Sequence, residues 1–205
     1  MPKLGMGPIR RKQLVDAAIA VIHEEGFTHA TVARIARKAG VSSGIVHHYF
    51  ASKDDLLFAT MRFLLSELRR DAAARLLVAS GPTERIGAVI DASFGDAQLD
   101  ERVFSAWLAL YGNARQSERL KRILLLYHRR LRANLMFDLR KLTSAPCAGR
   151  IADGIAAMID GLWLRYALTG KPRDPDEPRA MTREYFAIAL KQSLTMPPGI
   201  LRVAS

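Results

Sequence analysis

The sequence has almost no cysteine and no long apolar run. Cys147 is the only cysteine among 205 residues, so the chain cannot form an internal disulfide, and a secreted fold held by such bridges is excluded. The most apolar stretch, "IAAMIDGLWLRYAL", is interrupted by Asp160 and Arg165 and falls short of the roughly 18 uncharged residues of a membrane span. The start, "MPKLGMGPIRRKQ", lacks the apolar core of a signal peptide. These absences predict a cytoplasmic protein with no membrane partner.

Acidic residues are also scarce relative to basic ones. Lys and Arg number 31 against 20 Asp and Glu, which gives a net charge of +11. Such an excess favours polyanionic partners, nucleic acid first and anionic membrane second. Charge alone does not decide between a nucleic-acid partner and a protein that is simply basic.

Patterns typical of enzymes are missing or out of place. "GVSSG" matches the G-x-S-x-G pattern of serine hydrolases, but that motif needs a strand before its turn, and the preceding "TVARIARKA" has a helical period. His47 and His48 are neighbours in a predicted helix and point about 100° apart, so they cannot share one metal ion. There is no P-loop and no dinucleotide fingerprint. The sequence predicts neither an enzyme, nor a metal site, nor a cofactor.

Almost every segment has helical spacing of its apolar residues, and none alternates as a strand does, so the predicted fold class is all-α. Leu14, Ala18, Val21 and Ile22 form one apolar stripe that ends at Gly26. The length suits a small domain joined to a larger one. The predicted division is a three-helix domain over residues 1–55, a helical bundle over 56–196 and a disordered tail over 197–205.

Two short helices in the first domain flank a glycine turn. Thr31 is a predicted N-cap of the first, and Gly40 stands where a helix end needs positive φ. Ser42 or Ser43 caps the second, which runs through Tyr49. Two short helices joined by a turn of this length form a helix-turn-helix.

The second short helix is expected to face outward, because Ile45, Val46 and Phe50 can cover its inner side. A major groove accepts one helix, whose first turns contact base edges. His47 can bond to a purine edge, and Lys53 is predicted to bind phosphate beside the free N–H groups of the next helix. The alternative is that these side chains lie at an ordinary solvated surface, with His48 packed against the body of the domain. The net positive charge and the glycine turn favour insertion into the major groove. The predicted DNA-binding residues are Thr31, Ser42, Ser43, Gly44, Ile45, His47, Tyr49, Lys53, Arg10 and Arg11.

The stretch "TVARIARKAGVSSGIVHHYFASKDDLL" resembles the DNA-binding segment of the TetR family of bacterial regulators. Those proteins carry a Gly-Val-Ser turn, a Tyr-Phe pair and a Ser-Lys helix start at this spacing. The resemblance implies a homodimer that binds a palindromic operator in double-stranded DNA. It also implies that the larger domain binds a small-molecule effector and forms the dimer contact, with repression usually relieved by the effector.

A narrower resemblance points to one branch of that family, the choline-responsive repressors of the glycine-betaine pathway. It rests on "MPKLGM", "IRRKQL", "GIVHHYF" and "IDGLWLRYALTGKP". The chain departs from that branch at Ser43 and His47, where Thr and Ser are usual, and at Leu110 and Tyr111, where a Phe-Trp pair is usual. The first departure concerns the operator sequence and the second the effector.

A choline-like effector has no N–H donor, so only aromatic faces and carboxylates attract its cation. Trp107 and Tyr111 are four residues apart and share a helix face, as do Asp91 and Phe94. Aromatic residues at this spacing more often belong to a core. The predicted effector-binding residues are Phe94, Trp107, Tyr111, Tyr127, Trp163 and Asp91.

The predicted dimer seam uses the last two long helices. Its apolar stripe is Ile151, Ile155, Met158, Ile159 and Leu162, with Phe186 and Leu190 from the last helix. Two rival hypotheses are a DNA-coating protein without an effector, whose binding would depend on salt but little on sequence, and a helical enzyme acting on a small cation.

Overall fold

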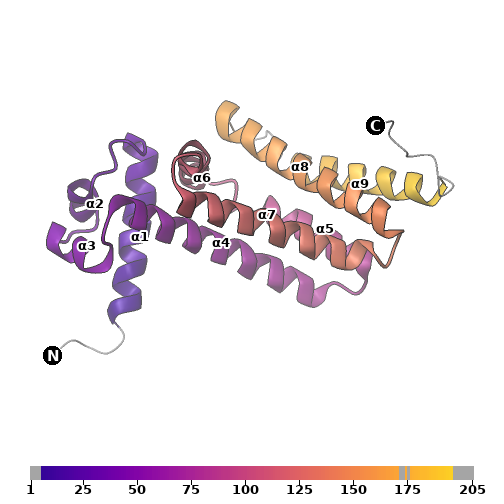
Figure 1. Cartoon of the computed structure of the whole chain (residues 1–205), viewed down its shortest axis with the longest axis horizontal. Coiled ribbons are helices and arrows are strands. Elements are labelled where there is room, and N and C mark those ends of the chain that lie inside the picture. The colour runs from indigo at the N-terminus through magenta and orange to yellow at the C-terminus, as the bar shows by residue number, and fades with distance from the viewer. Residues whose placement is uncertain (1–5, 171–173, 175, 196–205) are drawn as a thin grey trace. The chain divides into compact units, whose positions relative to one another are not determined.

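The computed structural model describes residues 6–170, 174 and 176–195 of the chain. Within them the secondary structure is helical and contains no strand, which confirms the predicted all-α class (Figure 1). The predicted tail, 197–205, lies outside the described residues. The helices are α1 (Met6–Glu25), α2 (Val32–Lys38), α3 (Ser43–Tyr49), α4 (Lys53–Val78), α5 (Pro82–Ser93), α6 (Glu101–Ala114), α7 (Glu118–Leu139), α8 (Ala145–Thr169) and α9 (Glu177–Thr195).

The chain forms two compact units that interleave along the sequence. The first comprises the described residues of 1–69 and 97–127, and the second those of 70–96 and 128–205. Helices α4 and α7 therefore each contribute to both units. The domain boundary at residue 55 stays a prediction.

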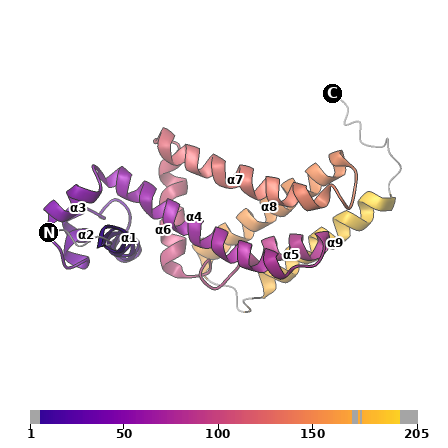
Figure 2. The same ribbon diagram turned by 90° about the horizontal axis from the view of Figure 1, so that it is seen from below.

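The first unit is built around α1. Leu14, Ala18, Val21 and Ile22 are all buried, as their spacing predicts. Helix α2 packs on α1 and on α3, and α6 packs on α1 from the other part of the unit (Figure 2). Gly26 ends α1 at φ 80°, and two hydrogen bonds close the end of α2, from Gly40 N–H to Arg37 O and from Val41 N–H to Ala36 O. Gly40 has φ 66°, the positive value that the sequence predicts for a helix end.

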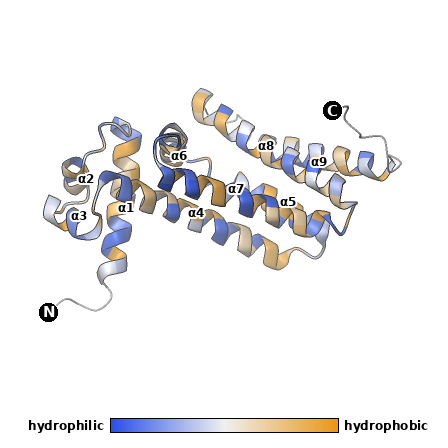
Figure 3. Cartoon of the chain, in the orientation of Figure 1, coloured by the Kyte–Doolittle hydropathy of each residue, from blue (hydrophilic) through white to orange (hydrophobic). Residues whose placement is uncertain are grey.

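The second unit packs α5, α8 and α9 together, and α8 and α9 lie side by side in Figures 1 and 2. Apolar residues line much of α8 (Figure 3). The stripe predicted for the dimer seam is largely buried inside this unit, since Ile151, Ile155, Ile159, Leu162 and Phe186 are at most 7% exposed. That part of the seam prediction is wrong: a stripe this wide already has its partners within the chain. None of the described helices is long and apolar enough to span a bilayer.

Candidate DNA-binding face and effector residues

Helix α3 presents one side to solvent. Val46 and Phe50 are at most 1% exposed and hold the helix on the unit's core. Ser43, Gly44 and His47 are exposed, as expected of a helix that reads DNA. The structure differs from the sequence prediction at Ile45, which is 38% exposed rather than turned inward. The outward side of α3 is therefore wider and more apolar than the sequence indicated.

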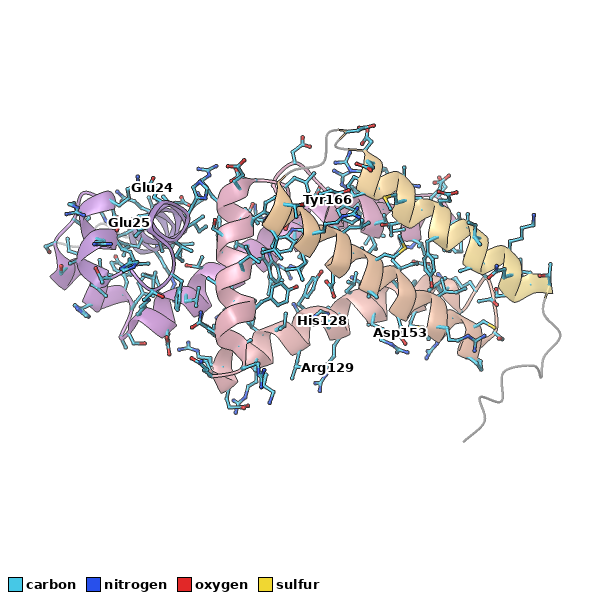
Figure 4. The ribbon with its side chains drawn as sticks, turned by 90° about the horizontal axis from the view of Figure 1, so that it is seen from above. Glu24, Glu25, His128, Arg129, Asp153 and Tyr166 are labelled. Atoms are coloured by element: carbon cyan, nitrogen blue, oxygen red, sulfur yellow. The ribbon has the colours of Figure 1, made fainter. Side chains whose placement is uncertain are left out.

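Hydrogen bonds and ion pairs fix the position of α2 and of the turn before α3. The Thr31 hydroxyl accepts a bond from the backbone N–H of Arg34 at 3.3 Å, which confirms the predicted cap. Glu25 pairs with Arg34, and Glu24 pairs with Lys38 at 2.5 Å, so the end of α1 holds both ends of α2 (Figure 4). Ser42 is the N-cap residue of α3 but its side chain makes no capping bond, so its hydroxyl is not committed to the helix.

Arg10 and Arg11 lie beside the recognition helix. Arg10 lines an open hollow of about 420 Å³ together with Ser42, Gly44, Ile45, His48 and Tyr49. Arg11 places its guanidinium 4.7 Å from the centre of the Phe50 ring. The first turns of α1 thus add two cations to the border of the α3 face, where a duplex backbone would pass.

The ammonium group of Lys53 is turned toward the α1–α2 loop. It donates hydrogen bonds to the backbone carbonyls of Phe27 and, at 3.1 Å, Thr28. It also lies 4.1 Å from the centre of the Phe27 ring. Partial burial lowers the pKa of this ammonium, and nearby Asp54 opposes the shift. The phosphate contact predicted for Lys53 therefore competes with bonds that the free chain already makes.

The structure adds a residue that the sequence reasoning did not single out. Arg119, in the first turn of α7, pairs with Asp55 at 2.7 Å, and its guanidinium lies 3.9 Å from the centre of the Phe58 ring. A cation in the first turn of a helix is disfavoured by the macrodipole. Nothing in the sequence pattern connects Arg119 with Asp55, which lies 64 residues earlier.

Three of the predicted effector residues gather in the first unit. The Trp107 ring lies 5.2 Å from that of Tyr127 and 6.0 Å from that of Tyr111, measured between centroids. Trp107 is 4% exposed, while both tyrosines are half-buried. Tilted aromatic faces of this kind can attract an organic cation.

The other three candidates belong to the second unit. The Asp91 carboxylate accepts two hydrogen bonds from Arg183, at 3.0 and 2.6 Å, and this contact raises the pKa of Arg183. Phe94 is fully buried, and Trp163 is 7% exposed. Asp91 therefore already has a cationic partner within the chain.

Other reactive side chains do not assemble into a site. No group of three or more His, Cys, Asp or Glu able to hold a metal occurs in the described part of the chain. The pKa of the Cys147 thiol is lowered, first by a hydrogen bond from Ser144 and then by Arg150. His128 faces Asp160 at 3.4 Å, and Arg132 pairs with Asp153 at 2.6 Å (Figure 4).

Comparisons with known proteins agree with this architecture. Residues 14–60 match the family model of bacterial regulatory proteins of the tetR family, and residues 82–191 match the C-terminal domain of BetI-type transcriptional repressors. A curated relative from Brucella suis, named HTH-type transcriptional regulator BetI, is 49% identical over 190 residues, which cover 93% of this chain and 96% of the relative.

Solved structures share the fold. A putative transcriptional regulator from Pseudomonas aeruginosa PAO1 is 27% identical, with a TM-score of 0.78, and the match covers 91% of this chain and 94% of that one. A putative regulator from Saccharomonospora viridis, described as a complex with choline, has a TM-score of 0.74 at 20% identity, covering 88% and 96%. The chain belongs to the TetR family and carries a BetI-type C-terminal domain, so it is a ligand-responsive DNA-binding transcriptional repressor and not an enzyme.

Proposed function

We propose that the chain reads its operator through the outward side of α3. The observation that carries this proposal is the division of α3 into a buried side, Val46 and Phe50, and an exposed side with Ser43, Gly44 and His47. Gly44 has no side chain to hold the helix away from the duplex. Ser43 and His47 supply groups that bond to base edges.

The proposed phosphate contacts border that side. Arg10 and Arg11 lie beside α3, and the exposed Thr31 stands at the start of α2, where a hydroxyl and free N–H groups suit a phosphate. Contacts of this kind set register and affinity but carry no sequence information. The exposed Ile45 is suited to a thymine methyl group.

Base substitution in a selected operator tests these roles. We expect His47→Ala to lose discrimination at one base pair, worth about 1–3 kcal/mol, whereas Arg11→Gln weakens all sequences alike. Discrimination is measured by competition against duplexes changed at single positions. Equal effects of the two variants on every duplex would refute this division of roles.

The proposed effector is choline or a chemically similar small cation. Support comes from the ring cluster of Trp107, Tyr111 and Tyr127. The name of the BetI relatives adds to it, because it links this branch of the family to the glycine-betaine pathway. The choline complex of the Saccharomonospora viridis regulator shows what a chain of this fold can hold; at 20% identity it carries no ligand over to this one.

We propose that the protein acts as a homodimer in the cytoplasm, where its operator lies. Helices α8 and α9 keep exposed apolar residues after packing on each other: Leu164 is 41% exposed, Leu168 67%, Met181 36% and Ile188 50%. Two such pairs of helices related by a two-fold axis would bury these residues against their copies. A dimer also sets two recognition helices on successive half-sites of one duplex.

A further inference from the structure

The start of α4 is tied to the end of the recognition helix by a reciprocal pair of hydrogen bonds. The backbone N–H of Asp55 donates to the Ser52 hydroxyl at 3.1 Å, and the Asp55 carboxylate accepts from the N–H of Ala51 at 3.3 Å. The arrangement is a variant of the capping box, since the carboxylate accepts from Ala51, one residue before the N-cap Ser52. Ala51 directly follows Phe50, the C-cap residue of α3, whose backbone N–H donates to Val46 O. The Asp55 carboxylate therefore moves with the chain that leaves the recognition helix.

Arg119 reaches the same carboxylate from α7. It binds the second oxygen, Oδ1, at 2.7 Å, and its guanidinium is stacked on the Phe58 ring at 3.9 Å from the centroid. A planar guanidinium that is both stacked and bonded to a carboxylate has little freedom to reorient. The ion pair also offsets the cost of a cation at the start of α7.

Helix α7 carries Arg119 and Tyr127 on one rigid segment of about two turns. Between them Ile123 is 5% exposed and seats the helix in the first unit. The Tyr127 ring packs on Trp107, so a displacement of that ring would be felt at Arg119 on the same helix. The Arg119 and Asp55 side chains are 51% and 22% exposed, so their ion pair contributes little to stability by itself.

We propose that Arg119 is a positioning residue that conveys the position of α7 to the recognition helix through Asp55. The proposal rests on the proposed function in one respect, the assignment of Trp107 and Tyr127 to the effector. A change at the aromatic cluster shifts α7, and Arg119 then shifts the Asp55 carboxylate to which it is bound. Because that carboxylate also holds the N–H of Ala51, α3 changes its fit to the groove. A purely structural Arg119 would stabilise the start of α4 without linking it to Tyr127.

A double-mutant cycle on DNA affinity separates these two roles without any ligand. The probe is a duplex selected by the wild-type protein from a random-sequence pool, and Kd is measured by fluorescence anisotropy. We expect Tyr127→Ala to change Kd by about threefold or more in the wild-type background and to have almost no effect in Arg119→Gln. Equal effects of Tyr127→Ala in the two backgrounds, including no effect in either, would overturn the proposal.

Two control variants sharpen the cycle. Arg122→Gln removes an exposed arginine three residues after Arg119 on α7. Arg122 makes no ion pair within the described part of the chain, so this variant should leave the effect of Tyr127→Ala intact. Arg119→Lys keeps the charge and should restore most of it. Loss of the effect in Arg122→Gln, or no recovery in Arg119→Lys, counts against a specific link through Asp55.

Choline adds a second arm to the same experiment. If choline weakens DNA binding by the wild-type protein, Arg119→Gln should reduce that fold-change about threefold or more, while choline affinity of the DNA-free protein stays the same. Failure of choline to act on the wild-type protein counts against the proposed effector alone, because the cycle with Tyr127→Ala still decides the role of Arg119.

Discussion

The hydroxyl group of Tyr185 occupies the space that a Cβ atom on Gly154 would need. Helix α9 can therefore rest on α8 at this point only because residue 154 has no side chain. Gly154→Ala forces the Tyr185 ring, whose carbon atoms are also in the way, to leave its place. We expect a loss of about 1–3 kcal/mol in the free energy of unfolding, as for other overpacked positions, measured by urea denaturation.

Gly112→Ala is the matched control for that substitution. Gly112 is exposed within α6, and nothing lies within 4 Å of the Cβ that alanine would add, so alanine should stabilise the helix by about 0.5–1 kcal/mol. In Gly154→Ala, the further change Tyr185→Leu should cost less than it does in the wild type, because it removes the clashing ring. Additive costs would show that the two residues do not compete for space.

Substitution of Lys53 tests whether its ammonium group contacts a DNA phosphate or only groups within the protein. Its ammonium bonds to the Phe27 and Thr28 carbonyls and lies on the Phe27 ring. We therefore expect Lys53→Met to lower the unfolding midpoint and to weaken DNA binding without changing its dependence on salt concentration. Removing a single phosphate contact would instead lower the slope of log Kd against log salt by about 0.9.

Arg11→Gln is the comparison for Lys53, because the Arg11 guanidinium is exposed at the border of α3. This substitution should flatten the salt slope by the equivalent of about one phosphate. If Lys53→Met flattens the slope to the same extent, the ammonium leaves its carbonyl partners on binding DNA, and the role predicted from the sequence is right.

Local signals predicted the first unit better than the second. The caps and glycine turns around α2 and α3 act over a few residues, so Thr31 and Gly40 could be placed from the sequence. In the second unit α8 and α9 begin at Ala145 and Glu177, so that Pro146 and Pro178 lie in their first turns. Proline fits the first turn of a helix as well as a loop, so it does not by itself place the start of a helix.

Partners distant in the sequence could not be predicted. Asp91 looked like a free carboxylate for a cationic effector, yet Arg183, 92 residues further on, binds it with two hydrogen bonds. The link from Arg119 to Asp55 is hidden in the same way. A periodic pattern shows which residues share a helix face; it does not show whether the chain itself already covers that face.

The exposed apolar residues of α8 and α9 predict a dimer contact that one charged substitution on either helix should disrupt. We expect Ile188→Glu to yield monomers in light scattering, because it would place two carboxylates in one apolar contact. Operator affinity should fall as well, since each half-site is then bound alone. Val78→Glu, at a position 81% exposed on α4, is the control and should leave the mass unchanged; a dimeric Ile188→Glu would place the contact elsewhere.

Choline binding should raise the thermal unfolding midpoint, because a ligand that binds only the folded state stabilises it. At a concentration of 100 times Kd the gain is about 2.7 kcal/mol, which corresponds to a rise of about 5–10 °C for a chain of this size. Betaine, betaine aldehyde and unrelated cations are the comparison ligands.

Trp107→Leu should lose the rise, because the Tyr111 and Tyr127 rings both lie against that indole. Asp91→Asn should keep it, because the Asp91 carboxylate is bound by Arg183. The opposite pattern, with the rise lost in Asp91→Asn and kept in Trp107→Leu, would move the cation from the aromatic cluster to the carboxylate in the second unit.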